Sequence, residues 1–183
     1  MVSSSSLITK KIIAYSLKDL LKSKDFSKIS IKEIMHQADY RRQTFYDYFS
    51  DKEELLRWIY QQELSEVIDD FINYESTEKI IARTLQYLET NKLFYQKTLQ
   101  AIPEPQVNAI FIHSFNRLLK STFSAYSEKG LPESVTTMYS YALLAIIKEW
   151  LFTNCELKRD DLEIHLLTNL NWIIKNSLAD SID

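Results

Sequence analysis

Apolar residues recur at helical spacing along almost the whole chain. Between residues 7 and 23 they fall on one face of a helix, and the lysines occupy other positions. Residues 31–38 carry apolar side chains at i, i+3, i+4 and i+7, directly after Ser30-x-x-Glu33, which is the sequence of a helix-capping box. The pattern therefore predicts two amphipathic helices at the start of the chain.

A third, shorter helix is predicted from Arg41 or Arg42 to about Phe49. Phe45 and Phe49 stand one helical turn apart, so we expect both rings to pack against the first two helices. Two short helices joined by a tight turn, with a third helix packed on them, are typical of a helix-turn-helix that binds DNA. The N-terminal region is therefore expected to form a three-helix DNA-binding domain.

The remaining sequence is also expected to be helical. Ser50-x-x-Glu53 has the form of a second capping box and predicts the start of a long helix over residues 51–71. Gly130 is expected to end one later helix, and Pro132 to lie in the first turn of the next. Asp160-x-x-Glu163 suggests the start of the last helix. The later helices are predicted over residues 77–90, 91–101, 106–127, 132–154 and 160–178.

Together these elements predict an all-α fold of about nine helices. We expect two domains: a helix-turn-helix DNA-binding domain over residues 1–51 and a C-terminal helical domain over residues 52–183, which serves regulation and dimerisation. The long helix that begins near residue 51 connects them.

Composition removes several classes of protein. The chain has 183 residues with 45% hydrophobic content, enough to bury a core. Gly130 is the only glycine, so glycine-rich phosphate or dinucleotide loops are absent and a large antiparallel sheet is not expected. Cys155 is the only cysteine and has no disulfide partner within the chain. With no basic-then-apolar leader and no apolar run near the length of a membrane span, we expect a cytoplasmic protein without contact to a membrane.

Charge is distributed unevenly along the chain. The net charge is −3, which by itself argues against a nucleic-acid partner. However, residues 1–58 contain 11 Lys and Arg against 8 Asp and Glu, whereas residues 59–183 contain 11 against 17. The positive part of the chain is therefore the part that contains the helix-turn-helix, as a DNA-binding protein requires.

The first turn of the third helix supplies the groups that can recognise DNA. Arginine can donate two hydrogen bonds to guanine and glutamine can pair with adenine, so Arg42 or Gln43 is expected to contact a base. Asp47 faces solvent, orients an arginine or accepts from cytosine; the sequence does not distinguish these roles. Ser30 is placed near phosphate, although capping alone explains it. The predicted DNA-binding residues are Ser30, Arg41, Arg42, Gln43, Thr44, Tyr46, Asp47, Tyr48 and Lys52.

The helices expected near residues 132–154 and 160–178 are unusually apolar. An apolar arc wider than one stripe needs two packing partners, and one of them is the core of the domain. We expect the second to be the same helices of another copy, across a two-fold axis. A homodimer would place two recognition helices on the half-sites of a palindromic operator in double-stranded DNA.

The segment Ala38-Asp-Tyr-Arg-Arg-Gln-Thr-Phe-Tyr-Asp-Tyr-Phe49, followed by Lys52 and Leu55, resembles the signature of the TetR family of transcriptional regulators. The resemblance implies nine helices, with dimerisation through the last two. It also implies that Thr44, Tyr46 and Lys52 contact phosphate and that Arg42 and Gln43 contact bases.

The chain departs from the family pattern at two positions. Asp39 replaces the usual turn glycine, and Arg41 stands where a capping Ser or Thr is common. Aspartate tolerates the left-handed backbone that such a turn needs, at some cost. Without a capping Ser or Thr, the third helix is expected to begin at Arg41 or Arg42, and Arg41 is available as an additional DNA contact.

Further likeness extends over the C-terminal half. A TetR subgroup that activates dihydroxyacetone-kinase operons is similar to this chain at residues 91–97 and 148–151. The Arg41–Phe49 segment in the N-terminal part resembles the same subgroup. This implies an activator of genes for dihydroxyacetone or glycerol metabolism, working with a dihydroxyacetone-binding co-activator protein. The alternative is a repressor that a small-molecule inducer, bound in the C-terminal domain, releases from its operator. The candidate pocket residues for an inducer are Tyr87, Phe94, Phe111, Phe115, Tyr141 and Trp150.

An enzyme is not expected. His36, His113 and His165 lack the spacing of metal ligands, and the chain contains no cysteine pair or nucleophile elbow. Neither a metal ion nor another cofactor is predicted.

Overall fold

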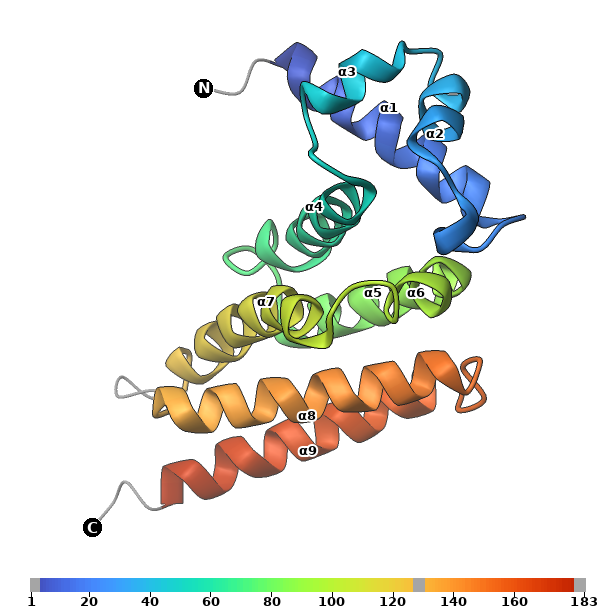
Figure 1. The fold of residues 1–183 in the computed structure, drawn as a ribbon. Helices are drawn as coiled ribbons and strands as arrows, with labels where there is room; N and C mark the ends of the chain where they lie inside the picture. Colours follow the sequence, from blue (N-terminus) through green and yellow to red (C-terminus); the bar gives the residue numbers. More distant parts are fainter. Residues whose placement is uncertain (1–3, 127–130, 180–183) are drawn as a thin grey trace. The chain divides into compact units, whose positions relative to one another are not determined.

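The structure, a computed structural model, describes residues 4–126 and 131–179, and every regular element in these ranges is helical (Figure 1). The all-α prediction is confirmed. The α-helices are α1 (Ser4–Leu21), α2 (Ile31–Gln37), α3 (Arg42–Tyr46), α4 (Lys52–Leu64), α5 (Thr77–Thr90), α6 (Lys92–Thr98), α7 (Glu104–Ser124), α8 (Glu133–Phe152) and α9 (Arg159–Ala179). A 3-10 turn, η1 (Phe26–Lys28), joins α1 to α2, and a π-helical turn, η2 (Ser65–Asp69), follows α4.

The described residues form two compact units. Unit 1 contains the chain up to Gln61 together with Leu93–Val107, and unit 2 contains Gln62–Lys92 together with the chain from Asn108 onward. The predicted functional boundary between residues 51 and 52 stays a prediction. The compact units divide the chain elsewhere, because most of α4 and of α6 packs with the N-terminal helices.

Unit 1 is held together by aromatic side chains. In α3, Phe45 is completely buried, and its ring centroid lies 5.6 Å from that of Phe49, as the one-turn spacing predicted. Tyr60 of α4 stacks on Tyr95 of α6 with 5.7 Å between ring centroids, and its hydroxyl donates to Thr98 Oγ1 at 2.7 Å. The helix-turn-helix therefore rests on α4 and α6, which come from two separate stretches of the chain.

The capping box of α2 is confirmed. Glu33 N donates to Ser30 Oγ at 3.3 Å, and Ser30 N donates to Glu33 Oε2 at 2.9 Å. Lys24 forms an ion pair with the same carboxylate. Hydrogen bonding from Lys24, and then from Ser30, lowers the pKa of Glu33 from 4.5 to about 2.

The prediction for the start of α4 is wrong by one residue. The helix begins at Lys52, and Asp51 caps it by accepting from Glu54 N at 2.6 Å. The Glu54 side chain accepts from Ser50 N at 2.7 Å, so Glu54 has the capping role that was predicted for Glu53. Both spacings fit a capping box, and the pattern did not separate them.

The predicted helix over residues 51–71 is also wrong beyond Leu64. There the backbone widens into η2, in which Asp70 N donates to Ser65 O at 3.0 Å. Val67 and Ile68, which are adjacent in the sequence, are both buried there. A π-turn of this kind inserts one residue into a helix and leaves no clear mark on apolar periodicity.

The ends of α3, α8 and α9 also differ from the predictions. Helix α3 stops at Tyr46 rather than near Phe49, and Phe49 follows in a turn. Pro132 is the N-cap of α8, not a first-turn residue. Helix α9 begins at Arg159, so Asp160 lies inside its first turn. Gly130, the predicted end of the preceding helix, lies outside the described residues.

Unit 2 contains η2, α5, α7 from Asn108 onward, α8 and α9. Helix α5 packs against α9, and the side chains of Leu85, Phe111, Phe115 and Ile147 are buried in this unit. Within the described ranges, no helix combines the length and the apolar character that crossing a membrane requires.

Candidate nucleic-acid interface

The surface of α3 carries the predicted DNA-contacting residues. Phe45 anchors the helix in the core of unit 1, while Arg41, Arg42, Gln43 and Tyr46 are exposed around it. Asp47 is also exposed, and Thr44 and Tyr48 are half-buried. A short helix with one buried anchor and polar groups on its other faces can enter a major groove.

The turn before α3 adopts the backbone that was expected of it. Asp39 has φ 57°, in the left-handed region, and Tyr40 N donates to Met35 O at 2.9 Å. Arg41 is the N-cap residue of α3, and its side chain forms no capping hydrogen bond. The Arg41 guanidinium is therefore available for a contact outside the protein.

Arg42 and Tyr46 form a pair on the exposed face of α3. Arg42 Nη2 donates to Tyr46 Oη at 3.0 Å, and the guanidinium carbon lies 5.8 Å from the centroid of the Tyr46 ring. The Tyr46 hydroxyl accepts this bond, so its own proton remains available to a phosphate oxygen. The sequence predicted separate roles for the two residues, although their spacing of four on a helix indicates the contact.

Lys52 is held by the protein itself. Its ammonium donates to Phe26 O at 2.8 Å, Ser27 O at 3.3 Å and Ile29 O at 3.0 Å, and lies 4.6 Å from the centroid of the Phe26 ring. These three bonds use all three N–H groups, so a phosphate could bind only by displacing a carbonyl. The geometry favours a different role, in which Lys52 fastens the segment between α1 and α2. Sequence spacing gave no sign of it, because the partners lie more than twenty residues away.

Ser30 is likewise occupied by its cap. Its hydroxyl donates to Glu33 Oε2 at 2.6 Å and accepts from Glu33 N. Capping therefore accounts for Ser30 without a phosphate.

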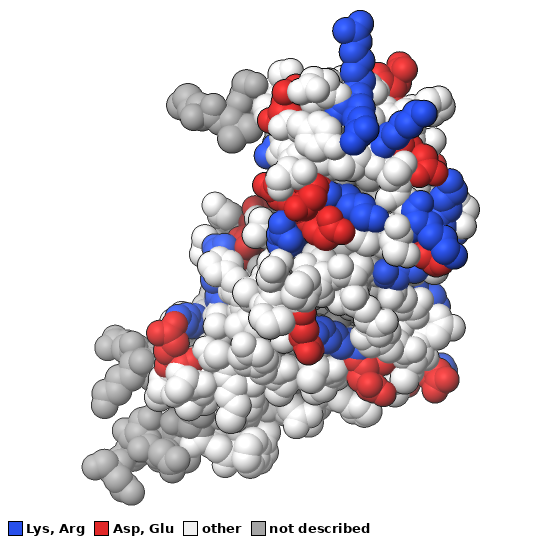
Figure 2. All heavy atoms as spheres, viewed as in Figure 1, with Lys and Arg blue, Asp and Glu red and all other residues white. Residues whose placement is uncertain are grey.

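Positive charge is concentrated on unit 1. On the face shown in Figure 2, many Lys and Arg side chains lie over its helices, whereas the surface over α8 and α9 is mostly uncharged. Lys22 and Lys28 are paired with nearby aspartates. Among the described cations around α3, Lys32, Arg41 and Arg42 have no carboxylate partner, so their charge is not neutralised within the protein.

The six predicted pocket residues do not surround a common cavity. Phe94 belongs to unit 1, where it packs on Tyr60. In unit 2, Trp150 is buried and donates to Leu157 O at 2.8 Å, whereas Tyr141 is exposed. The remaining three are the half-buried Tyr87 and the buried Phe111 and Phe115.

A pocket of about 260 Å³ in unit 2 is lined by other residues. Phe115 borders a second cavity of only about 10 Å³. Helical spacing identifies aromatic residues that face inward, but it does not show where packing leaves space. Within the described residues, no group of His, Cys, Asp and Glu side chains is arranged to hold a metal ion.

Comparisons with known proteins follow the same division of the chain. Residues 17–59 match the family described as bacterial regulatory proteins, tetR family, and residues 75–170 match a transcriptional regulator C-terminal region. A Lactococcus lactis protein, the HTH-type dhaKLM operon transcriptional activator DhaS, is 35% identical over 148 residues, which is 78% of each chain. An HTH-type transcriptional regulator of Bacillus subtilis, YxbF, is 37% identical over 132 residues, covering 72% of this chain and 30% of that protein.

Solved structures agree with this match. The structure of the dihydroxyacetone kinase operon activator DhaS covers 93% of this chain and 98% of its own, with 32% identity and a TM-score of 0.79. The fatty acid degradation regulator FadR from Bacillus halodurans shares the fold, with a TM-score of 0.68 at 16% identity, over 88% of this chain and 94% of its own. The proteins that these comparisons find are transcriptional regulators and not enzymes, and regulators of this type bind DNA and are generally dimeric. The chain therefore belongs to the TetR family of transcriptional regulators.

Proposed function

We propose that this regulator activates genes for dihydroxyacetone or glycerol metabolism, as a homodimer on a palindromic operator. The observation that carries the proposal is the 35% identity to the dhaKLM operon activator over 78% of both chains. The similarity of the two structures, with a TM-score of 0.79, supports it. Bacterial DNA lies in the cytoplasm, so we expect the protein to act there.

The exposed face of α3 supports a division of roles in DNA binding. Arg42 can donate two parallel hydrogen bonds to guanine in the major groove, and Gln43 can pair with adenine in the same way. Arg41, Thr44, Tyr46 and Tyr48 carry donors that suit phosphate oxygens, which fix the register of the helix on DNA. In this assignment Lys52 stabilises the segment between α1 and α2 and does not contact phosphate.

Exposed apolar side chains on α8 and α9 support the homodimer. Met138, Tyr141 and Ile146 follow one face of α8, and Ile164 and Trp172 follow one face of α9. Two of them, Ile164 and Trp172, are 60% and 65% exposed in the single chain. Large apolar side chains gathered on one surface indicate a contact with another protein. A two-fold contact here would carry two α3 helices to half-sites about 34–36 Å apart, or a multiple of that spacing.

An activator also needs a signal. We propose that a dihydroxyacetone-binding protein supplies it as a co-activator, which is what the likeness to dihydroxyacetone-kinase operon activators implies. Activation would then require both proteins on the operator, and the regulator alone would bind DNA without raising transcription.

Selection of bound duplexes from a random pool tests the DNA-binding part. We expect a palindromic sequence, and we expect it upstream of genes for dihydroxyacetone or glycerol metabolism. A reporter carrying this sequence should be expressed more strongly when the regulator and its co-activator are both present. Lower expression in the presence of the regulator would contradict the activator assignment, and failure to enrich any sequence would contradict operator binding.

A repressor controlled by a small molecule is the second candidate, and the pocket of about 260 Å³ in unit 2 favours it. A ligand of this kind raises the melting temperature of the free protein and weakens its binding to the operator. The reporter would then be repressed by the regulator alone and released by the ligand.

A further inference from the structure

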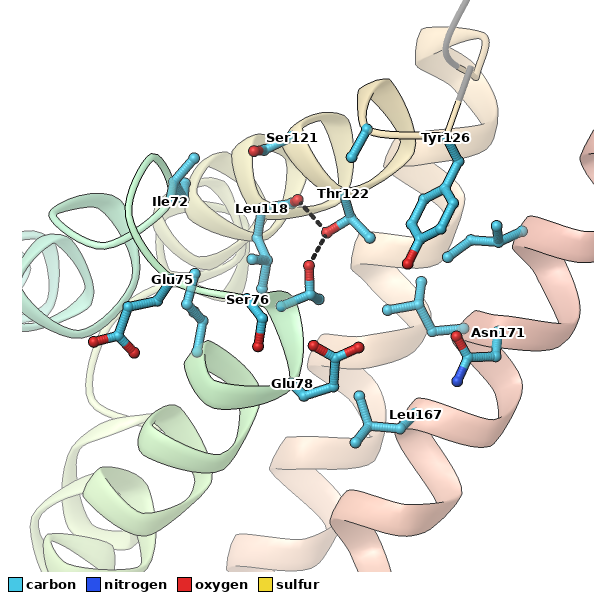
Figure 3. Close-up of a pocket in the computed structure, with 15 residues that line it drawn as sticks. Ile72, Glu75, Ser76, Glu78, Leu118, Ser121, Thr122, Tyr126, Leu167 and Asn171 are labelled. Atoms are coloured by element: carbon cyan, nitrogen blue, oxygen red, sulfur yellow. Dashed lines mark hydrogen bonds between the residues drawn. The ribbon is translucent and has the colours of Figure 1, made fainter.

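The pocket in unit 2 lies where three helices meet. Its walls come from the turn before α5 and the start of α5, from the end of α7, and from the second half of α9 (Figure 3). The lining residues of α9 include Leu170 and Ile174, which are buried, while Ile164 and Trp172 of the same helix are exposed. The pocket and the proposed dimer surface therefore use different residues of α9.

Two of the hydroxyl groups in the wall, those of Thr77 and Thr122, are hydrogen-bonded to each other. Thr122 Oγ1 donates to Leu118 O at 2.8 Å, so its proton is used within α7. Thr77 Oγ1 lies 2.7 Å from Thr122 Oγ1, and with the Thr122 proton directed at Leu118 O, Thr77 is the donor of that bond (Figure 3). After this relay, Thr77 has lone pairs but no proton to offer to a ligand.

Two carboxylates add to this acceptor character. Glu75 is paired with Arg83 at 2.8 Å, whereas Glu78 has no hydrogen-bond or ion-pair partner among the described residues. Figure 3 shows the Glu78 carboxyl group directed into the pocket, in the region between Ser76 and Asn171. No Lys, Arg or His is among the lining residues. An anion bound here would meet uncompensated negative charge, while a cation would be attracted.

The rest of the lining combines hydrocarbon with the polar side chains of Ser76, Ser121, Tyr126 and Asn171. Ile80 and Leu118 are buried beside the pocket, and Leu170 and Ile174 close it from α9. A ligand that fills it therefore needs an apolar body as well as a charged end. At about 260 Å³, the space suits a small molecule rather than a long acyl chain or a large drug.

We propose that this pocket binds a small organic ammonium compound with a hydrocarbon body. Its N–H groups would donate to the Glu78 carboxylate and the Thr77 hydroxyl, and its hydrocarbon would pack on the leucine and isoleucine side chains. Since the chain is a transcriptional regulator, we further infer that the pocket is an effector site; this second step rests on the proposed operator binding.

Three probes of the same size and different charge test the ligand class: hexylammonium, hexanoate and hexanol. Binding to the full-length protein is measured by calorimetry at neutral pH. We expect hexylammonium to bind most tightly, hexanol more weakly and hexanoate not at all. Equal affinity for all three, or preference for hexanoate, would overturn the proposal.

Variants locate the binding. Glu78→Gln removes the charge at an exposed position, so we expect the fold to survive and the dissociation constant of hexylammonium to rise about threefold or more. Glu78→Lys should abolish binding. Glu156→Gln, an exposed glutamate of unit 2 outside the pocket, is the matched control and should bind as the unaltered protein does. Unchanged affinity in both Glu78 variants would place the ligand elsewhere and refute the assignment.

The effector role needs a separate measurement. Affinity for the selected operator is determined without and with saturating hexylammonium, in the unaltered protein and in Glu78→Lys. A change in the first and none in the second supports the role. Ligand binding without any change in operator affinity would refute it. Absence of operator binding in the ligand-free protein would refute the proposed function instead, so the two failures are distinguishable.

Discussion

The Arg42 guanidinium is oriented before DNA arrives. Tyr46 accepts a hydrogen bond from Arg42 Nη2 at 3.0 Å, and its ring lies beside the guanidinium. An exposed arginine normally loses rotamer freedom when it binds, and a side chain already held in place loses less. The same Tyr46 hydroxyl can donate to phosphate, so one residue would link base contact to the register of the helix.

Arg42 and Tyr46 can be tested together. Arg42→Ala should weaken binding to the selected operator by about 1–3 kcal/mol and relax the preference at one base position of each half-site. Tyr46→Phe keeps the ring and removes the hydroxyl, so we expect a smaller loss of about 0.5–1.5 kcal/mol with partial relaxation at that same position. Quantitative binding to operators altered one position at a time measures both.

Tyr74→Phe is the control, because Tyr74 is an exposed tyrosine of unit 2. It should leave operator binding unchanged. If Tyr46→Phe weakened all operator variants equally, Tyr46 would be a phosphate contact alone, without influence on Arg42.

Lys52 gives a second residue-scale prediction. Its ammonium binds three backbone carbonyls, so Lys52→Ala should lower the free energy of unfolding by about 2 kcal/mol, since hydrogen bonds to charged groups are among the stronger ones. Lys32→Ala removes an exposed lysine without a carboxylate partner and should leave stability nearly unchanged. Urea denaturation measures both variants.

The salt dependence of operator binding separates the two roles of Lys52. A phosphate contact predicts that Lys52→Ala lowers the slope of log affinity against log salt concentration by about one. A supporting role predicts an unchanged slope and a less stable fold. A lower slope with full stability would contradict the supporting role.

At the scale of elements, the cap of α2 predicts a dependence on pH. The pKa of Glu33 is lowered from 4.5 to about 2, so its ionised form is favoured by folding. The stabilisation is therefore complete above about pH 4.5 and is lost as the pH falls towards 2. Glu33→Gln should be less stable than the unaltered protein at pH 6, and the difference should shrink on acidification.

Thermal unfolding between pH 6 and pH 2 measures this difference. Glu53→Gln is the control, because Glu53 lies in the first turn of α4 and its side chain has no partner among the described residues. Its difference from the unaltered protein should not vary in the same way. A constant difference for Glu33→Gln across this range would show that its charge does not act through the cap.

Helices with complete local signals were predictable from the sequence. The capping box of α2 is formed as expected, and α5 spans Thr77–Thr90, the range that apolar spacing predicted. The end of α4 was not predictable, because the π-turn depends on which side chains the core of unit 2 accepts. The prediction of the α4 cap was wrong for another reason. Ser50 and Asp51 are each followed three residues later by a glutamate, and only the backbone direction selects Asp51 as the cap.

Prediction of the site followed the same rule. Exposure of Arg41, Arg42 and Gln43 could be inferred, since helical spacing places Phe45 on the buried side. The bonds of Lys52 and the location of the pocket depend on contacts between distant parts of the chain. Aromatic residues were therefore a poor guide to the cavity, which is lined mainly by Ile, Leu, Ser, Thr and Glu.

At the scale of the whole molecule, charge and apolar surface are separated along the chain. Positive charge without acidic partners surrounds α3, and large exposed apolar side chains lie on α8 and α9. One α3 helix of five residues can contact few bases, so a single helix-turn-helix domain would give weak and poorly specific binding. Two such domains joined through the apolar surface bind as one unit, because the second binding event becomes intramolecular.

This coupling predicts that substitutions on the exposed face of α9 weaken binding to the operator. Ile164→Glu and Trp172→Glu each place a carboxylate on the proposed surface of both protomers, where it faces apolar groups or its own symmetry mate. Loss of one large apolar side chain on each side weakens association by at least about 3 kcal/mol. Sedimentation velocity should show monomers at concentrations where the unaltered protein is dimeric.

Operator binding should follow the change in assembly. Each variant should lose affinity for the complete palindrome while keeping the weak affinity of the unaltered protein for a single half-site, because α3 is untouched. Glu156 lies outside the exposed apolar faces of α8 and α9, so Glu156→Gln should preserve the dimer and its affinity for the operator. If Ile164→Glu and Trp172→Glu remained dimeric, the dimer contact would lie on another surface. If they became monomeric and still bound the palindrome with full affinity, the two helix-turn-helix domains would not bind DNA as one unit.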